Sequence, residues 1–465
     1  MRKKIILIFL NFFFIGLAIY ACLLFFKKNT SFDAQKIVNN SVLKDKTFET
    51  NIKEITLKDG LKAWYFEQTG APIIALDFCF ENAGYAFNEE QKEGISTLFA
   101  SLLSEGAGNF PKQDFADLME ENAIEIDFDT SYDALFVSMT TPKDNALLAF
   151  ELLKAALDAP HFDQNHIDIK RTQQLTAIKM QNERPEKILA KTFKKKFFSS
   201  HPLGHSSLGD EKSLQNITRN DLIAYLKNHL TKDNLIISIV GDLSQDEAQN
   251  LLNDLFENLP EKSDIPPLPP ATVSYGFDKE NISRNMPQVL ARFVAPGTLR
   301  LNDDFYALYI ANEAFGGSGL NSRLNKIARE KEGLTYGAYT YLDTLKYAPS
   351  IQGSFATSKE NYQKMLSILL QEWQKIADFG ISETEFEAVK SNMLTSFNLR
   401  FMSLSDISTQ LLYMQKEHLG LDFLQKRNEY VKNTTLDEVN RAAKKYFSFK
   451  PSVLTIGNNE LKGEN

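Results

Sequence analysis

DLIAYLKNHLTKDNLIISIVG, residues 221–241, is matched later in the chain by DEVNRAAKKYFSFKPSVLTIG, residues 437–457. Each stretch runs through a helical segment, a polar turn and a short apolar strand to a glycine. Two shorter matches follow the same order: Glu105-Gly106-Ala107-Gly108 falls on Phe315-Gly316-Gly317-Ser318, and Ser131-Tyr132-Asp133 falls on Tyr341-Leu342-Asp343. Together these matches predict a tandem duplication of about 210 residues.

The regions around the matches alternate between strand and helix patterns. In the first half we expect strands at 73–80, 124–128, 134–140 and 235–240, and helices at 95–103, 114–122, 145–158, 163–182 and 221–229. The expected fold class is α+β: two homologous halves, each an antiparallel-rich sheet with helices packed on it, facing each other across a cleft.

Five prolines between residues 260 and 270 predict an extended linker between the halves. The expected parts are a signal anchor or signal peptide (1–28), a polar stalk (29–50), an N-terminal half (51–259), the proline-rich linker (260–270) and a C-terminal half (271–465).

The composition excludes several classes of protein. Of 465 residues, 43% are hydrophobic and 24% charged, and 52 basic against 60 acidic side chains give a net charge of −8. These values exclude a collagen-like chain, a disordered chain and a polytopic membrane protein. The acidic balance argues against a nucleic-acid partner, which requires a basic surface. Two cysteines, Cys22 and Cys79, are too few for a disulfide framework or a thiolate zinc cluster.

The N-terminal segment has the pattern of a membrane signal. Arg2, Lys3 and Lys4 precede an apolar run at residues 5–26. About 20 helical residues cross a bilayer, so this run is long enough to span one. Bulky Tyr20 makes a poor cleavage site, which favours an uncleaved anchor over a cleaved signal peptide. The rest of the chain is then expected outside the cytoplasm, in the periplasm, anchored to the inner membrane by residues 5–26.

Short motifs recur along both halves in a fixed order. The first half contains Glu81-Asn82-Ala83-Gly84, Glu93-Gly94-Ile95-Ser96, Gly106-Ala107-Gly108, Thr130-Ser131-Tyr132-Asp133, His201-Pro202-Leu203-Gly204, Ser207-Leu208-Gly209 and Val240-Gly241-Asp242. The second half contains Gly316-Gly317-Ser318-Gly319 and, from Arg329 to Tyr336, REKEGLTY. In this order the motifs resemble the insulinase/pitrilysin metallopeptidase superfamily, in particular its small bacterial and mitochondrial-processing-peptidase-like proteins. The resemblance covers residues 51–457 and implies two homologous α+β halves.

Active members of the resembled family bind zinc through an inverted motif, H-x-x-E-H, and a distal glutamate. Placed by Gly94-Ile95-Ser96, the motif positions here are Thr97, Ala100 and Ser101, and the distal position falls near Ala177. Hydroxyls are poor zinc ligands and alanine has no donor atom, so we expect no metal and no cofactor in this chain. The resemblance implies that zinc resides in a partner subunit.

The second half keeps the other features of the family. The resemblance implies that the arginine and tyrosine of R-x6-Y hold the substrate backbone and polarise the scissile carbonyl, and Arg329 and Tyr336 match this spacing. A guanidinium offers a planar donor fork, and a phenol can donate a hydrogen bond to a developing oxyanion. The alternative is a surface ion pair for Arg329 and a packed strand position for Tyr336. Gly316-Gly317-Ser318-Gly319 resembles the glycine-rich loop with which noncatalytic subunits handle substrate; the alternative is a helix-ending turn.

These observations support a leading hypothesis and two alternatives. The leading hypothesis is a noncatalytic subunit of a heterodimeric zinc endopeptidase, which contributes Arg329 and Tyr336 to peptide hydrolysis by a zinc-bearing homologous partner. The second hypothesis is a peptide-binding or structural scaffold protein, similar to inactive homologues in a respiratory complex. The third is an autonomous peptidase with displaced ligands at His201 and His205, although Pro202 and Gly204 between them predict a loop.

Overall fold

The first half is built on a sheet whose strands follow the apolar stretches of the sequence. The computed structural model of the protein describes residues 51–275, 279–317, 319 and 321–458. Within these residues the first sheet has six strands in the order β1-β2-β6-β3-β5-β4. The strands are β1 (Lys53–Thr56), β2 (Lys62–Glu67), β3 (Ile73–Glu81), β4 (Glu125–Thr130), β5 (Ala134–Pro142) and β6 (Leu235–Gly241). The β2–β6 pair is parallel and the other pairs are antiparallel.

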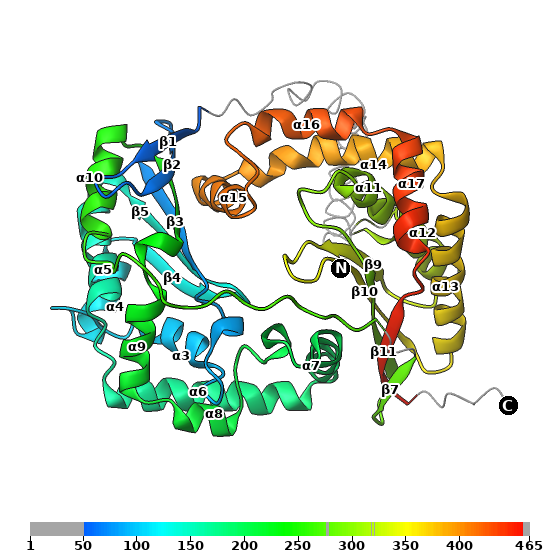
Figure 1. The fold of residues 1–465 in the computed structure, drawn as a ribbon, viewed down its shortest axis with the longest axis horizontal. Helices are drawn as coiled ribbons and strands as arrows, with labels where there is room; N and C mark the ends of the chain where they lie inside the picture. The colour runs from blue at the N-terminus through cyan, green and yellow to red at the C-terminus, as the bar shows by residue number, and fades with distance from the viewer. Residues whose placement is uncertain (1–50, 276–278, 318, 320, 459–465) are drawn as a thin grey trace, which may run out of the picture. The chain divides into compact units, whose positions relative to one another are not determined.

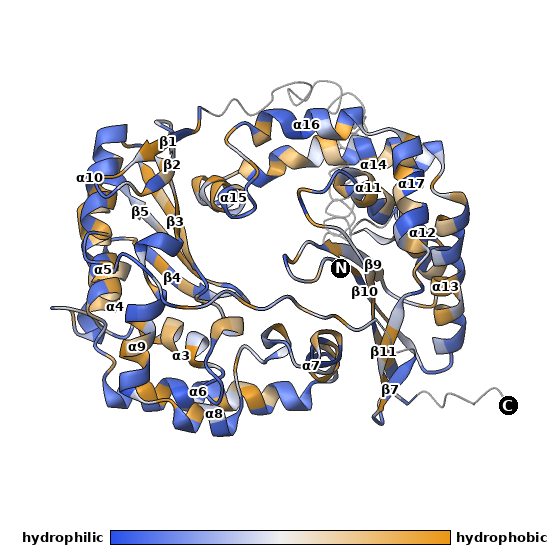
Figure 2. Ribbon diagram, viewed as in Figure 1, coloured by the Kyte–Doolittle hydropathy of each residue, from blue (hydrophilic) through white to orange (hydrophobic). Residues whose placement is uncertain are grey.

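The helices of the first half are α3 (Ile95–Leu102), α4 (Lys112–Glu121), α5 (Ala146–Asp158), α6 (Gln164–Glu183), α7 (Pro185–Phe198), α8 (Glu211–Asn216), α9 (Arg219–His229) and α10 (Gln245–Leu255). Residues of α3, α5 and β3 share one hydrophobic core, which includes Phe99 of α3 and Phe78 of β3. Figure 2 shows β3 as largely hydrophobic, whereas the outer helix α10 carries hydrophilic residues as well. A strand that is buried along almost all its length, as β3 is, needs apolar residues on both faces.

The second half repeats this topology. Its described strands form a sheet in the order β7-β11-β8-β10-β9, with β7 (Glu280–Ser283), β8 (Gln288–Pro296), β9 (Ala338–Asp343), β10 (Ser350–Ser358) and β11 (Ser452–Gly457). The strand β11 pairs in parallel with β7 and antiparallel with β8, just as β6 pairs with β2 and β3. The helices are α11 (Phe305–Gly316), α12 (Arg323–Asn325), α13 (Tyr362–Phe379), α14 (Glu383–Ser396), α15 (Leu404–Lys416), α16 (Phe423–Asn433) and α17 (Leu436–Phe447).

Each half covers part of the other half's sheet with a helix. From the first half, α7 packs against β8 and β11, and from the second half, α15 packs against β3 and β6 (Figure 1). The aromatic side chains of α7, among them Phe193 and Phe197, share a hydrophobic cluster with Val294 and Ile456. On the other side, Ser238 of β6 donates a hydrogen bond to the Ser408 carbonyl of α15, over 2.8 Å. The exchange of helices therefore joins the two halves through buried contacts.

The structure confirms the predicted fold class. The quoted stretch 221–241 forms α9 and β6, and its counterpart 437–457 forms α17 and β11, at equivalent places in the two sheets. The proline-rich segment 260–270 lies between α10 and β7. The described residues of this connection contain no helix or strand. The predicted anchor at residues 5–26 lies outside the described residues and stays a prediction. Among the residues that are described, no helix has the length and apolar character needed to cross a membrane.

Candidate functional site

The positions of the lost zinc motif lie on α3, which packs against α6. Thr97 donates a hydrogen bond from Oγ1 to the Ser207 carbonyl, over 2.8 Å. Ser101 donates from Oγ to the Leu98 carbonyl of its own helix, over 2.7 Å. Ala100 is buried on α3, and Ala177 is half-buried on α6. Both hydroxyls at the positions assigned to the zinc motif are therefore hydrogen-bonded to backbone carbonyls of this chain.

Gln174 fixes this arrangement at the start of α3. Its Nε2 donates to the carbonyls of Gly94 (3.0 Å) and Leu208 (2.9 Å), which joins α6, the first turn of α3 and the loop that receives the Thr97 hydroxyl. Gly94 precedes α3 with a left-handed φ of 92°. A side chain at Gly94 would lie 2.5 Å from the Leu208 oxygen, so both the backbone angle and the close approach require glycine.

These residues do not fit a zinc ion. Zinc is held in proteins by thiolate, imidazole or carboxylate groups, and none of the four motif positions supplies one. The two hydroxyls also have their hydrogens committed to backbone carbonyls. Across the described chain, histidine, cysteine, aspartate and glutamate side chains form no group of three that could hold a metal ion.

His201 and His205 lie in a loop, as Pro202 and Gly204 predict. The ring of His201 accepts a hydrogen bond at Nδ1 from the Leu203 amide (3.2 Å) and contacts the Pro269 carbonyl through Nε2 (2.9 Å). Both nitrogens of His201 are therefore used in holding a 3₁₀ turn at residues 202–204 and the proline-rich segment. Neither ring nitrogen of His201 is therefore free to bind a metal ion in this arrangement.

Arg329 and Tyr336 lie on the segment that leads into the edge strand β9. Arg329 belongs to a π-helical turn, Lys326–Lys331, and its half-buried side chain makes no hydrogen bond or ion pair with any residue that the structure describes. Tyr336 lies in a bend two residues before β9 and is 89% exposed. The alternative in which Tyr336 packs in a strand is therefore wrong. No contact within the described residues accounts for such an exposed aromatic side chain.

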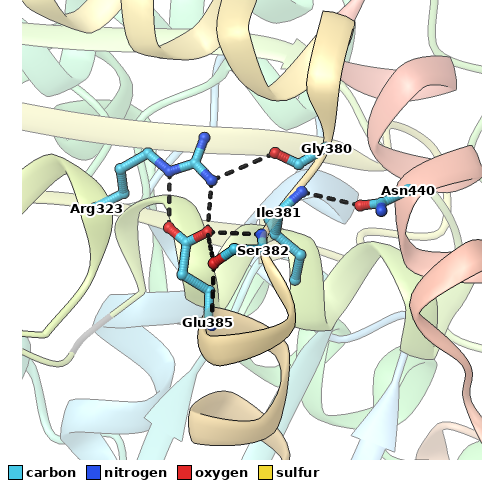
Figure 3. A network of polar contacts seen from close by, with 6 residues as sticks. All are labelled: Arg323, Gly380, Ile381, Ser382, Glu385 and Asn440. Atoms are coloured by element: carbon cyan, nitrogen blue, oxygen red, sulfur yellow. Dashed lines mark hydrogen bonds and ion pairs between the residues drawn. The ribbon is translucent and has the colours of Figure 1, made fainter.

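A clamp holds the start of this segment in place (Figure 3). Arg323 of α12 donates from Nε and Nη2 to the two carboxylate oxygens of Glu385, over 2.8 and 2.6 Å, and from Nη2 to the Gly380 carbonyl. Ser382 caps α14 and donates to the same carboxylate. Burial raises the pKa of Glu385, but the hydrogen bonds from Arg323 and Ser382 outweigh it and hold that pKa below its usual range. The clamp fixes α12, and with it the π-helical turn that carries Arg329, to α14.

The glycine-rich segment begins as a helix end. Gly316 is the last residue of α11, and the Gly317 amide donates to the Asn312 carbonyl over 3.1 Å. Ser318 lies outside the described residues, and Gly319 is exposed in a bend. The first two glycines therefore form the helix-ending turn, while Gly319 lies beyond it on the surface.

A cavity of about 800 Å³ lies between elements of the two halves. Its first-half lining includes Tyr85, Tyr132, four lysines of α7 and the loop that receives the Thr97 hydroxyl, and its second-half lining includes Arg292, Asp343 and Gln352. Gln352 donates to Asp343 over 2.9 Å and accepts from the Tyr341 hydroxyl over 3.0 Å. The cavity presents donors, acceptors and both charges, which suits a polar chain better than an apolar ligand.

Burial shifts the pKa values of two groups that line the cavity. Burial lowers the pKa of Lys194 to about 8; its ammonium lies 3.9 Å from the centre of the Tyr85 ring and donates to the His205 carbonyl over 2.8 Å. Burial raises the pKa of Tyr85, and the charges of Asp133 and Asp343 add to this effect. Asp133 and Asp343 are the residues that the 210-residue offset pairs, so the duplication brings both carboxylates close to one phenol.

The sequence interpretation missed the lysines of α7 and Gln352. Lysines at 187, 191, 194 and 195 follow helical spacing, so the signal for one basic face was present. Nothing local to α7 indicates that this face lines a cavity with Arg292 of β8 and Gln352 of β10, which follow about 100 and about 160 residues later.

Comparisons with known proteins agree with this geometry. The family model described as "Insulinase (Peptidase family M16)" matches residues 74–211, and "Peptidase M16 inactive domain" matches residues 216–393. A relative from Helicobacter pylori, named "Non-peptidase homolog YmxG", is 27% identical over 86% of this chain and 92% of its own length. A Bacillus subtilis relative, "Uncharacterized zinc protease YmxG", is 22% identical over 83% of this chain and 91% of its own length.

Solved structures share the fold. The M16 inactive-domain structure from Pseudomonas fluorescens superposes with a TM-score of 0.81 at 23% identity, covering 88% of this chain and 98% of the other. These comparisons confirm the resemblance inferred from the motifs. The chain therefore belongs to the insulinase family, peptidase family M16.

Proposed function

We propose that this protein is the noncatalytic subunit of a heterodimeric peptidase and supplies Arg329 and Tyr336 to the active site of a zinc-bearing homologue. In this proposal the Arg329 guanidinium binds a backbone carbonyl of the peptide. Tyr336 donates a hydrogen bond to the carbonyl oxygen of the bond that the partner cleaves. A donor aimed at developing charge is worth far more to the transition state than to the bound substrate.

The main support for this proposal is the contrast between the two candidate sites of the chain. At the former zinc positions, the hydroxyl groups are bound to this chain's own backbone. At the second site, Tyr336 is 89% exposed and Arg329 has no described partner, although the clamp at Arg323 holds the segment in place. Polar side chains that are positioned but unpaired support a role toward another molecule.

The scaffold hypothesis has its own support. The 800 Å³ cavity is lined by residues of a single chain, so peptide binding there needs no partner subunit. A scaffold or peptide-binding protein would bind peptide in isolation and would leave the cleavage rate of a zinc-bearing homologue unchanged.

The test measures peptide cleavage by a zinc-bearing family member from the same genome, alone and mixed with this protein. We expect cleavage to require the mixture. Tyr336→Phe should lower kcat about a hundredfold, the typical effect of removing one transition-state hydrogen-bond donor. Arg329→Ala removes a contact to the peptide backbone and should raise KM. Each variant should form the complex with unchanged affinity, as measured by analytical ultracentrifugation.

Two control variants match these substitutions. Lys331→Ala removes an exposed cation from the same π-helical turn, and Tyr430→Phe removes a hydroxyl from a 45% exposed tyrosine on α16. Both should leave cleavage unchanged. Full activity of the zinc-bearing protein alone, or of a mixture that contains Tyr336→Phe, would refute the proposal.

A further inference from the structure

Three arginines line a second cavity, which lies wholly within the C-terminal half. The cavity has a volume of about 200 Å³. Arg300 lies in the loop after β8, Arg400 in the 3₁₀ helix Phe397–Phe401, and Arg427 on α16. None of the sequence motifs includes these residues, and none lines the larger cavity described above.

Two of the three guanidinium groups lie over aromatic rings. Arg427 is 8% exposed, and its guanidinium carbon lies 4.3 Å from the centre of the Phe397 ring. Arg300 lies 4.0 Å from the centre of the Phe305 ring. A cation–π contact uses the positive charge of the guanidinium and does not require its N–H donors, which can still bind acceptors.

Only some of these N–H donors are used by the protein. Arg427 donates from Nη1 to the Met393 carbonyl over 2.8 Å and to Asn428 over 2.9 Å. Arg300 donates from Nη2 to the Tyr306 hydroxyl over 3.3 Å. Each guanidinium has five N–H donors, so most of the donors around the cavity have no acceptor in the described part of the chain.

The positive charge of the cavity is not neutralised by ion pairs. Among the described residues, no carboxylate lies within ion-pair distance of Arg300, Arg400 or Arg427. Glu313 and Glu417 are the carboxylates whose charge interacts with Arg400 and Arg300, and burial raises the pKa of both. Three cations held together, one of them buried, are costly unless an anion joins them.

The mouth of the cavity is open and partly apolar. Arg400 is exposed and Tyr413, another lining residue, is 41% exposed. Leu399 and Met402, which flank Arg400 in the sequence, are 61% and 77% exposed. Exposed apolar side chains on the segment that carries Arg400 fit a peptide ligand better than a free inorganic ion.

We propose that this cavity binds the carboxylate of an acidic side chain in a peptide. A volume of about 200 Å³ is too small for a complete ligand, since ligand pockets usually enclose about 300–1,000 Å³, but it accommodates one side chain. Guanidinium groups pair with carboxylates through charge-assisted hydrogen bonds, and the exposed Leu399 and Met402 near Arg400 offer apolar contacts to the neighbouring residues of the peptide. The proposal concerns binding to the isolated chain and does not depend on the role of Arg329 and Tyr336.

The test uses two peptides that differ in one group: acetyl-Leu-Glu-Leu-amide and its neutral isostere acetyl-Leu-Gln-Leu-amide. Isothermal titration calorimetry of the whole protein, without any partner, should show at least tenfold tighter binding of the glutamyl peptide. Arg400→Gln should remove this preference, since each tenfold step corresponds to about 1.4 kcal/mol, less than a typical hydrogen bond to a charged group. Arg400 is exposed, so its replacement preserves the fold.

Lys432→Gln is the matched control, because it removes one exposed positive charge from α16 outside the cavity. This variant should keep the preference for the glutamyl peptide. Three results would overturn the proposal: equal affinity for both peptides, an equal loss in Lys432→Gln and Arg400→Gln, or binding of inorganic phosphate without binding of the glutamyl peptide.

Discussion

Single side chains decide which of the two candidate sites can act. Thr97 and Ser101 stand one helical turn apart, but each hydroxyl hydrogen is directed at a backbone carbonyl of this chain. Such bonds satisfy the hydroxyls locally and also join α3 to the loop at Ser207. Tyr336 is the opposite case, because its phenol protrudes from a bend. The hydroxyls of Thr97 and Ser101 thus serve the chain's own structure, whereas the Tyr336 hydroxyl in the second half is exposed.

The burial of His229 predicts that the free energy of unfolding falls in acid. Its Nδ1 lies 2.8 Å from the Asn82 carbonyl, its ring stacks on Tyr225, and burial lowers its pKa to about 4 against the opposing effects of the Asn82 carbonyl and Glu89. In the unfolded chain the histidine has its usual pKa near 6.5. The contribution of neutral, buried His229 to the free energy of unfolding is therefore complete above pH 6.5 and is lost as the pH falls toward 4. The loss amounts to about 3 kcal/mol.

Urea unfolding between pH 7 and pH 4.5 measures this effect. His229→Gln keeps an amide donor for Asn82 but cannot titrate, so its free energy of unfolding should fall less steeply than that of the wild type. His418→Asn changes an exposed histidine and should follow the wild-type curve. Parallel curves for wild type and His229→Gln would contradict the assignment of the acid dependence to His229.

At the scale of elements, the segment from α11 to β9 carries the second-half features. The helix α11 ends at Gly316, the clamp fixes α12 to α14, and the π-helical turn and bend lead to β9. A side chain at Gly316 would lie 2.6 Å from Oγ1 of Thr340, which is buried on β9. The helix end is therefore packed directly on the edge strand.

This packing predicts different effects for the same substitution at Gly316 and at Gly319. Gly316→Ala should lower the free energy of unfolding by about 1–3 kcal/mol, because the added methyl group overpacks the contact with Thr340. Gly319→Ala should leave it unchanged, because the nearest atom, the Asn321 amide nitrogen, lies 3.9 Å from the new side chain. Thermal unfolding of both variants measures the difference.

Gly319→Ala then becomes a probe of function. If exposed Gly319 takes part in substrate handling, this stable variant slows peptide cleavage in the mixture with the zinc-bearing partner, which is the outcome we expect. An unchanged cleavage rate would show that the segment only ends α11. Equal destabilisation by both substitutions would contradict the steric argument.

Local patterns predicted the elements but not their partners. The apolar run at 95–103 is α3 and the run at 73–80 is β3, because burial on several sides requires continuous apolar residues. The assignment of Thr97, Ala100 and Ser101 to the zinc-motif positions, made from their distance to Gly94, stays a prediction. The hydrogen bond from Thr97 to Ser207 and the cluster around Arg427 were not predicted, since residues far apart in the chain meet only through the tertiary fold.

At the scale of the molecule, exchanged helices couple the two halves. The helix α7 completes the hydrophobic cover of β8 and β11, and α15 covers β3 and β6. Lys416 of α15 also forms an ion pair with Asp133 of the first half. Both sheets belong to one compact unit. Neither sheet keeps its full hydrophobic cover when the other half unfolds, so the halves should unfold together.

Phe197→Ala tests this coupling. Phe197 is fully buried on α7, with its ring centre 4.8 Å from Phe198 and 5.5 Å from Tyr275, and its removal should cost about 3–5 kcal/mol. Because α7 is anchored in the first half and packs on the second, calorimetry should show one transition at a lower temperature, with equal calorimetric and van't Hoff enthalpies. Phe379→Ala, at an 81% exposed position of α13, should leave the transition in place. Two separate transitions in Phe197→Ala, with one half melting at the wild-type temperature, would show instead that the helix exchange joins halves that are stable on their own.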